Sequence, residues 1–78
     1  MPINMDTFGD YVRSIRMKNS IGQRELARRL DISPSYLNDI EKNKRDAPRG
    51  ELIKLIGNIL KADTKKLYDL AGLSRNDI

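Results

Sequence analysis

The sequence predicts an all-α domain built from short helices, and three observations support this prediction. Apolar residues recur at spacings of three and four along most of the chain, which is the period of an amphipathic helix. Residues that cap or break helices separate these periodic segments at short intervals. No alternation of apolar and polar residues continues long enough to predict a strand. Because the chain has 78 residues, we expect a single domain over residues 1–78.

The first predicted helix begins near residue 8, where Phe8, Val12 and Ile15 recur at spacings of four and three. We expect Asn4 or Asp6 to cap its first turn, because short polar side chains accept hydrogen bonds from free N–H groups there. The residues that end this helix follow together: Asn19, Ser20 and Gly22.

Two short helices separated by a tight turn are predicted next. Apolar residues on one face of the first of them are Leu26, Ala27 and Leu30. Ser33 is a suitable N-cap for the following helix, and Pro34 fits its first position, where the missing N–H has no cost. We expect this third helix to direct Leu37 and Ile40 inward and to end near Asn43.

Residues 42–47 predict a polar, mostly basic loop, after which we expect Pro48 to open a fourth helix. The expected apolar face of that helix consists of Leu52, Leu55, Ile56, Ile59 and Leu60. A fifth helix, capped by Asp63 or Thr64, is expected to end at Gly72. Its inward residues are Leu67, Leu70 and Ala71.

Composition argues against an enzyme and favours a polyanionic partner. The chain lacks His and Cys, and with them the usual general base, the activated thiol and the common metal ligands. No pair of carboxylates or lysines stands out, so we expect no catalysis, no metal and no cofactor. The 15 Lys and Arg residues outnumber the 11 acidic ones, giving a net charge of +4. A basic domain of this size is a candidate for binding phosphates.

We expect the protein to be soluble and to remain inside the cell. The first eight residues lack the basic start and apolar run of a secretory leader. No segment approaches the ~20 apolar residues that a membrane span needs. The absence of Cys is compatible with a reducing compartment.

The most informative segment is residues 23–42. Counted from Gln23, apolar residues fall at the fourth, eighth, tenth, fifteenth and eighteenth positions. Two helices that cross at a steep angle over a short turn need this spacing. Ala27 is small, which lets the second helix approach the first closely. The segment therefore predicts a helix-turn-helix.

The segment QRELARRLDISPSYLNDIEKNKRDAP resembles the helix-turn-helix of phage repressors and Cro-like proteins, the Xre-type regulators. The positions that match the pattern of this family are Arg16, Gln23, Leu26, Ala27, Ser33, Ile40, Glu41, the basic residues 42–45 and Pro48. The match runs without a gap over about residues 8–70. One departure is Asp31, which stands at a turn position that is usually Gly.

The resemblance implies a compact five-helix bundle of the lambda-repressor-like type, whose third helix, about residues 34–42, reads the major groove of duplex DNA. It implies a sequence-specific transcriptional regulator, and repression is the expected outcome. It also implies a location in the bacterial cytoplasm, at the nucleoid, or a phage-encoded protein in a bacterial host. It also implies a partly buried ion pair between Arg16 and Glu41, and both residues lie beside core positions. If the turn is left-handed at Asp31, Asp is among the residues that tolerate it.

The polar residues that remain on the third helix are candidates for reading bases: Pro34, Ser35, Tyr36, Asn38 and Asp39. Asn can pair with adenine at two points, and Asp can accept from cytosine N4. Tyr36 has the alternative of covering the edge of the core. The expected phosphate ligands are Gln23, Lys42, Asn43, Lys44, Arg45 and Arg49. The alternative for this basic run is a solvated loop.

A single short helix covers few base pairs, so we expect a homodimer on a palindromic operator with half-sites about 34 Å apart. Candidates for the dimer interface are Tyr68, Leu73 and Ile78. The alternative function is a protein-interaction module of the same fold, such as an antitoxin or an adaptor, with a toxin or an anti-repressor as its partner.

Overall fold

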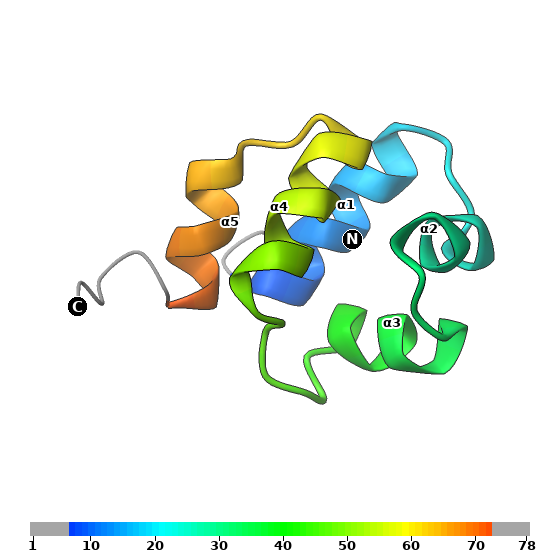
Figure 1. The fold of residues 1–78 in the computed structure, drawn as a ribbon, viewed down its shortest axis with the longest axis horizontal. Coiled ribbons are helices and arrows are strands. Elements are labelled where there is room, and N and C mark those ends of the chain that lie inside the picture. Colours follow the sequence, from blue (N-terminus) through cyan, green and yellow to red (C-terminus); the bar gives the residue numbers. More distant parts are fainter. Residues whose placement is uncertain (1–6, 73–78) are drawn as a thin grey trace.

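The computed structural model describes residues 7–72, and within that range it contains five α-helices and no strand. They are α1 (Phe8–Lys18), α2 (Gln23–Leu30), α3 (Pro34–Glu41), α4 (Gly50–Leu60) and α5 (Thr64–Ala71) (Figure 1). The predicted all-α fold of five helices is therefore confirmed. None of the helices in residues 7–72 has the length and hydropathy that crossing a bilayer requires.

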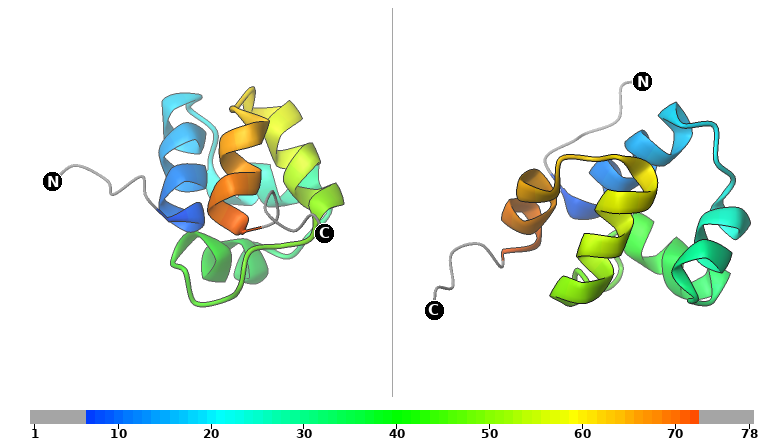
Figure 2. Two further views of the ribbon diagram at one scale, coloured as in Figure 1. Left: turned by 90° about the vertical axis from the view of Figure 1, so that its left-hand side faces the viewer. Right: turned by 45° about the horizontal axis from the view of Figure 1, so that its top comes forward.

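The helices form a bundle with α3 at one end. In the left view of Figure 2, α1, α5 and α4 stand side by side, while α3 and the 42–49 loop lie across their lower ends. Figure 1 shows α3 and this loop at the same end of the molecule. The main packing partners of α3 are α1 and α2. The outer side of α3 therefore faces away from the bundle.

All five helices contribute to one apolar core. Its most completely buried side chains are Val12, Leu26, Leu37, Ile40, Ile53, Ile56, Leu60 and Leu67. The predicted apolar face of α4 is wrong at two positions, because Ile53 is fully buried whereas Leu55 is 39% exposed. Successive helical residues are rotated by about 100°, so Ile53, Ile56 and Leu60 share one face while Leu55 points away from it.

Three helix boundaries differ from the sequence-based expectation. The N-cap of α1 is Thr7, whose hydroxyl accepts the Asp10 N–H, and the expected caps Asn4 and Asp6 lie outside the described residues. Helix α3 ends at Glu41, and α4 begins two residues after Pro48 with Arg49 as its N-cap. Pro48 fixes the extended approach to α4 instead of occupying its first turn.

Helix α2 ends at a residue in the left-handed conformation, the case that the sequence analysis considered for Asp31. Asp31 has φ 59° and ψ 43°, and it is the C-cap of α2. Left-handed backbone at a C-cap favours Gly, and Asp is one of the tolerated exceptions. Lys61 ends α4 in the same conformation, with φ 54°.

Candidate nucleic-acid interface

Helix α3 is fixed by its two ends and by its inner face. Ser33 caps its first turn by accepting the Tyr36 N–H at 3.0 Å. Leu37 and Ile40 are buried in the core at 0% and 1% exposure. The residues that remain on the outer side are the exposed Pro34 and Ser35 and the half-buried Tyr36, Asn38 and Asp39. These are the residues that the sequence predicted to read bases.

The C-terminal end of α3 is fastened to the start of α1 by Asn43. The Gly9 N–H donates to Asn43 Oδ1 at 3.0 Å, and Asn43 Nδ2 donates to Thr7 Oγ1 at 3.2 Å. A Cβ on Gly9 would lie 2.3 Å from the Ile40 carbonyl oxygen, so the two helices approach at a distance that only glycine allows. Asn43, a predicted phosphate ligand, therefore also joins the end of α3 to the start of α1.

Arg16 and Glu41 form an ion pair that joins α1 to α3. Arg16 Nε donates to Glu41 Oε2 at 2.7 Å, and Nη2 donates to Oε1 at 3.0 Å. Arg16 Nη1 also donates to the Ile21 carbonyl at 2.9 Å. The side chains are 12% and 2% exposed, respectively. This two-point geometry is the one in which a guanidinium binds a carboxylate most specifically.

Gln23, the first residue of α2, directs its amino group into the protein. Gln23 Nε2 donates to Glu41 Oε1 at 3.1 Å and to Asn38 Oδ1 at 3.4 Å. The sequence predicted that this side chain contacts a phosphate. In the structure its donor group is occupied by acceptors of α3, so its side chain links α2 to α3.

A polar groove of about 450 Å³ lies between α1, α2 and α3. Its lining consists of Asp10, Arg13, Arg16, Gln23, Asn38, Glu41 and Lys42. Arg13 and Lys42 are the exposed cations of this lining. The sequence analysis missed Arg13, although it precedes Arg16 by three residues and therefore shares its helical face.

The 42–49 loop carries most of the positive charge beside α3. Its exposed cations are Lys42, Lys44, Arg45 and Arg49. Arg45 is the one that also contacts α3: its Nε lies 3.6 Å from Asp39 Oδ2, and its guanidinium lies 5.1 Å from the centre of the Tyr36 ring. Tyr36 is half-buried against the core, which favours the expectation that it covers the core edge.

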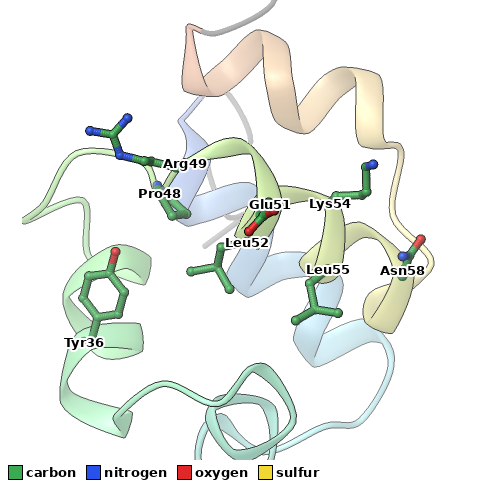
Figure 3. Close-up of a pocket in the computed structure, with 8 residues that line it drawn as sticks. All are labelled: Tyr36, Pro48, Arg49, Glu51, Leu52, Lys54, Leu55 and Asn58. Atoms are coloured by element: carbon green, nitrogen blue, oxygen red, sulfur yellow. The ribbon is translucent and has the colours of Figure 1, made fainter.

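A second groove, of about 780 Å³, lies between α3 and the outer face of α4 (Figure 3). Leu52 and Leu55 of α4 point into the space that Tyr36 bounds on the other side. Arg49, Lys54 and Glu51 supply charges around it. Leu55 is exposed in this groove, although the sequence periodicity had assigned it to the core.

Tyr68 is tied to the bundle, because its hydroxyl donates to the Gly50 carbonyl at 3.1 Å. This candidate for the dimer interface is half-buried between α4 and α5. The other two candidates, Leu73 and Ile78, lie outside the described residues. Within residues 7–72 no cluster of acidic side chains has the arrangement to hold a metal ion.

Helices α2 and α3 are joined by a tight turn with a left-handed residue, and α3 packs against both α2 and α1. Together with the polar outer face of α3, this arrangement defines a helix-turn-helix. The chain belongs to the helix-turn-helix domain family, whose model matches residues 9–77. The resemblance to Xre-type regulators is confirmed, as is the lambda-repressor-like fold. The curated relatives that share this domain are named as transcriptional regulators.

Two curated relatives are 31% identical to this chain over 65 residues: the uncharacterized HTH-type transcriptional regulators MT0491 and Rv0474 of Mycobacterium tuberculosis, strains CDC 1551 and H37Rv. The match covers 83% of this chain and 46% of each relative, so the chain spans about half their length.

Solved structures share the fold. ClgR, the clp gene regulator of Corynebacterium glutamicum, superimposes with a TM-score of 0.71 at 26% identity, covering 100% of both chains. The biofilm master regulator SinR, solved in complex with DNA, has a TM-score of 0.73 at 24% identity over 81% of this chain and 100% of its own.

Proposed function

We propose that this chain is a sequence-specific DNA-binding regulator that inserts α3 into the major groove of duplex DNA. The observation that carries the proposal is the placement of the polar side of α3 and the basic 42–49 loop at one end of the molecule (Figure 1). A helix is 10–12 Å across with its side chains, and the major groove is about 12 Å wide. The polar side of α3 therefore fits against base edges.

The cations beside α3 supply the phosphate contacts in this proposal. Lys42, Lys44 and Arg49 are exposed on the loop that leaves α3, and Arg13 is exposed at the rim of the polar groove. Phosphate contacts fix the position of a protein on the duplex, and base contacts supply the sequence preference. The fold of SinR, which was solved with DNA, supports this use of the bundle.

We further propose that two copies bind a palindromic operator and repress transcription by occupying it. Helix α3 has eight residues and is about 12 Å long, so one copy contacts only a few base pairs. Two copies with half-sites about 34 Å apart place both recognition helices on the same side of the duplex. Occupancy of an operator excludes other proteins and requires no further contact with the transcription machinery.

A salt titration on random duplex tests the DNA-binding proposal. The logarithm of the binding constant should fall by about 0.9 per phosphate contacted for each tenfold rise in salt. Lys44→Ala and Arg49→Ala should each weaken binding to all sequences equally and reduce this slope by about 0.9. Lys18→Ala is the matched control, because this exposed cation ends α1 at the far end of the molecule from α3.

The alternative is a protein-interaction module of the same fold, an antitoxin or adaptor that binds a protein partner. Such a module predicts duplex binding that is absent or insensitive to salt, with Lys44→Ala and Lys18→Ala behaving alike. Either result would contradict the DNA-binding proposal. Selection from a random DNA pool then measures the half-site and the spacing, and a single unpaired half-site would contradict the two-copy arrangement.

A further inference from the structure

We infer that Glu41 and Gln23 hold the Asn38 amide with its NH₂ group toward the DNA, so that Asn38 selects guanine. The inference rests on the proposed function and adds to it the identity of one base. It departs from the sequence-based expectation, in which Asn pairs with adenine. Its basis is a chain of hydrogen bonds from Arg16 to Asn38, in which each partner fixes the orientation of the next.

The chain begins with two groups whose hydrogen-bonding character cannot change. A guanidinium has only donors, and an ionised carboxylate has only acceptors. Arg16 occupies Oε2 and one lone pair of Oε1 of Glu41, which is only 2% exposed. The third bond to this carboxylate, at Oε1, must therefore come from a donor.

Gln23 supplies that donor. Its amide has one acceptor oxygen and one NH₂ group, and only the NH₂ group can bind the carboxylate at 3.1 Å. The side-chain carbonyl of Gln23 is consequently turned away from Glu41. A carbonyl oxygen cannot donate to a phosphate, so we assign the Gln23 side chain as a positioning residue and not a phosphate ligand.

The second hydrogen of the Gln23 NH₂ group determines the orientation of Asn38. Nε2 of Gln23 lies 3.4 Å from Oδ1 of Asn38. This distance is long for a hydrogen bond, but an N–H group at this distance still attracts a carbonyl oxygen and repels another N–H group. Rotating the Asn38 amide by 180° would place two NH₂ groups against each other. The favoured orientation therefore turns the oxygen of Asn38 inward and its NH₂ group outward, on the half-buried outer side of α3.

Base edges in the major groove discriminate between these orientations. Guanine presents two acceptors, N7 and O6, whereas adenine presents one acceptor and one donor. Two-point pairing with adenine requires both the oxygen and the NH₂ group of an Asn side chain. An Asn whose oxygen is turned inward toward Gln23 presents its NH₂ group to the base and holds its oxygen away from it. Guanine can accept both hydrogens, thymine and adenine can accept one, and cytosine offers a donor in the same place.

The test is selection of bound sites from a random duplex pool, followed by competition at the position that Asn38→Ala changes. We expect the wild-type protein to prefer guanine over adenine there by about tenfold, the lower part of the range for a two-point contact. Gln23→Met retains the side-chain length and removes the NH₂ group. This variant should reduce the preference for guanine over adenine to about twofold or less and leave the other positions of the half-site unchanged.

Asn38→Asp provides a second variant with nearly the same shape. Asp presents only acceptors, so the preferred base at this position should change to cytosine, whose N4 donates. Asn58→Asp is its matched control, because it makes the same chemical change on the exposed face of α4. It should leave the preference at every position unchanged.

An independent readout in the free protein separates the two levels of the proposal. The side-chain NH₂ protons of Gln23 should exchange with water more slowly than those of the exposed Asn58. A wild-type preference for adenine, or an unchanged preference in Gln23→Met, overturns the inference alone. Absence of duplex binding despite a protected Gln23 amide overturns the proposed function and the base assignment with it.

Discussion

The two ends of this bundle are attached in different ways. Helix α3 is held by two buried apolar residues together with a network of charged and amide groups from α1 and α2. Helices α4 and α5 are held by apolar contacts through Ile53, Ile56 and Leu67. The polar bonds at this end, such as that from Tyr68 to the Gly50 carbonyl, are single bonds between neutral groups. Apolar side chains can repack after a small rotation of a helix as long as the core volume stays filled. A hydrogen bond weakens steeply when the angle at its hydrogen departs from linear. The difference indicates that the orientation of α3 is fixed more tightly than that of α4 and α5.

The largest effect should come from breaking the network at its buried charge. Glu41→Ala leaves the 12%-exposed Arg16 without its carboxylate partner. Removing one partner of a buried ion pair destabilises a protein by about 3–5 kcal/mol. Urea unfolding monitored by circular dichroism measures the loss.

The double variant Arg16→Met/Glu41→Leu is the control for that experiment. It replaces both charges by apolar groups of similar size, and such replacements are often neutral or stabilising. We expect it to recover most of the stability but to bind operator DNA with weaker base preference, because Gln23 loses its acceptor. Equal instability of the single and double variants would show that packing, and not the charge, was lost.

Substitution of two glycines tests whether the helices approach each other more closely at the α1–α3 contact than at the α4–α5 contact. A Cβ on Gly9 would meet the backbone carbonyls of Ile40 and Glu41 at 2.3 and 2.8 Å, and a backbone cannot move aside cheaply. A Cβ on Gly57 would meet Thr64 Oγ1 at 2.7 Å, which is the end of a side chain.

We therefore expect Gly9→Ala to destabilise by about 3 kcal/mol, near the upper end for overpacking. Gly57→Ala should change stability by less than about 1 kcal/mol, because the gain in helix propensity offsets the contact. Thermal unfolding of both variants gives the comparison. Equal losses would mean that the α1–α3 contact has the same freedom to adjust as the α4–α5 contact.

Most of the buried apolar residues could be predicted from the sequence. The helical period identified part of the buried face of each helix, because the period of apolar residues reflects burial of one face. It misassigned Leu55 and missed Ile53, since two overlapping apolar faces exist on α4 and packing selects between them. The sequence marked Asp31 as a departure at a turn position that is usually Gly, and the structure shows left-handed backbone there.

The orientation of the polar groups was not predictable in the same way. Gln23 and Asn43 were assigned to phosphates from their residue type and position. In the structure Gln23 donates to Glu41, and Asn43 accepts from Gly9 and donates to Thr7. Their partners lie 18 and 34 residues away in the chain, so no local pattern reports these bonds. Whether the oxygen or the NH₂ group of a side-chain amide points outward depends on its neighbours in the folded structure, and the helical period of apolar residues carries no information about it.

A smaller effect on stability is expected at two left-handed C-cap residues, Asp31 at the end of α2 and Lys61 at the end of α4. Asp31→Gly should preserve or raise the free energy of unfolding, by up to about 1 kcal/mol, because Gly removes the strain of positive φ. Lys61→Gly should raise it more, since Lys lacks the short polar side chain that makes Asp tolerable there. Melting temperatures of the two variants decide the order. A marked fall in Asp31→Gly would show that the Asp side chain itself builds the turn.

The smallest effect concerns a charge cluster that is exposed instead of buried. Glu25 of α2 accepts from Arg28 at 2.5 Å and from Arg29 at 2.8 Å, and these bonds lower the pKa of its carboxyl from 4.5 to about 2. A lowered pKa in the folded state stabilises the protein fully above pH 4.5, and the contribution is lost as the pH falls toward 2.

We therefore expect Glu25→Gln to be slightly less stable than the wild type at pH 6, with the gap closing between about pH 4.5 and 2. A ¹³C titration of the Glu25 carboxyl measures the pKa directly, and Arg28→Gln should move it back toward its ordinary value. A Glu25→Gln loss as large as that of Glu41→Ala would contradict the comparison between the ends. It would mean that exposed charges on α2 fix the helix-turn-helix as firmly as the buried pair does.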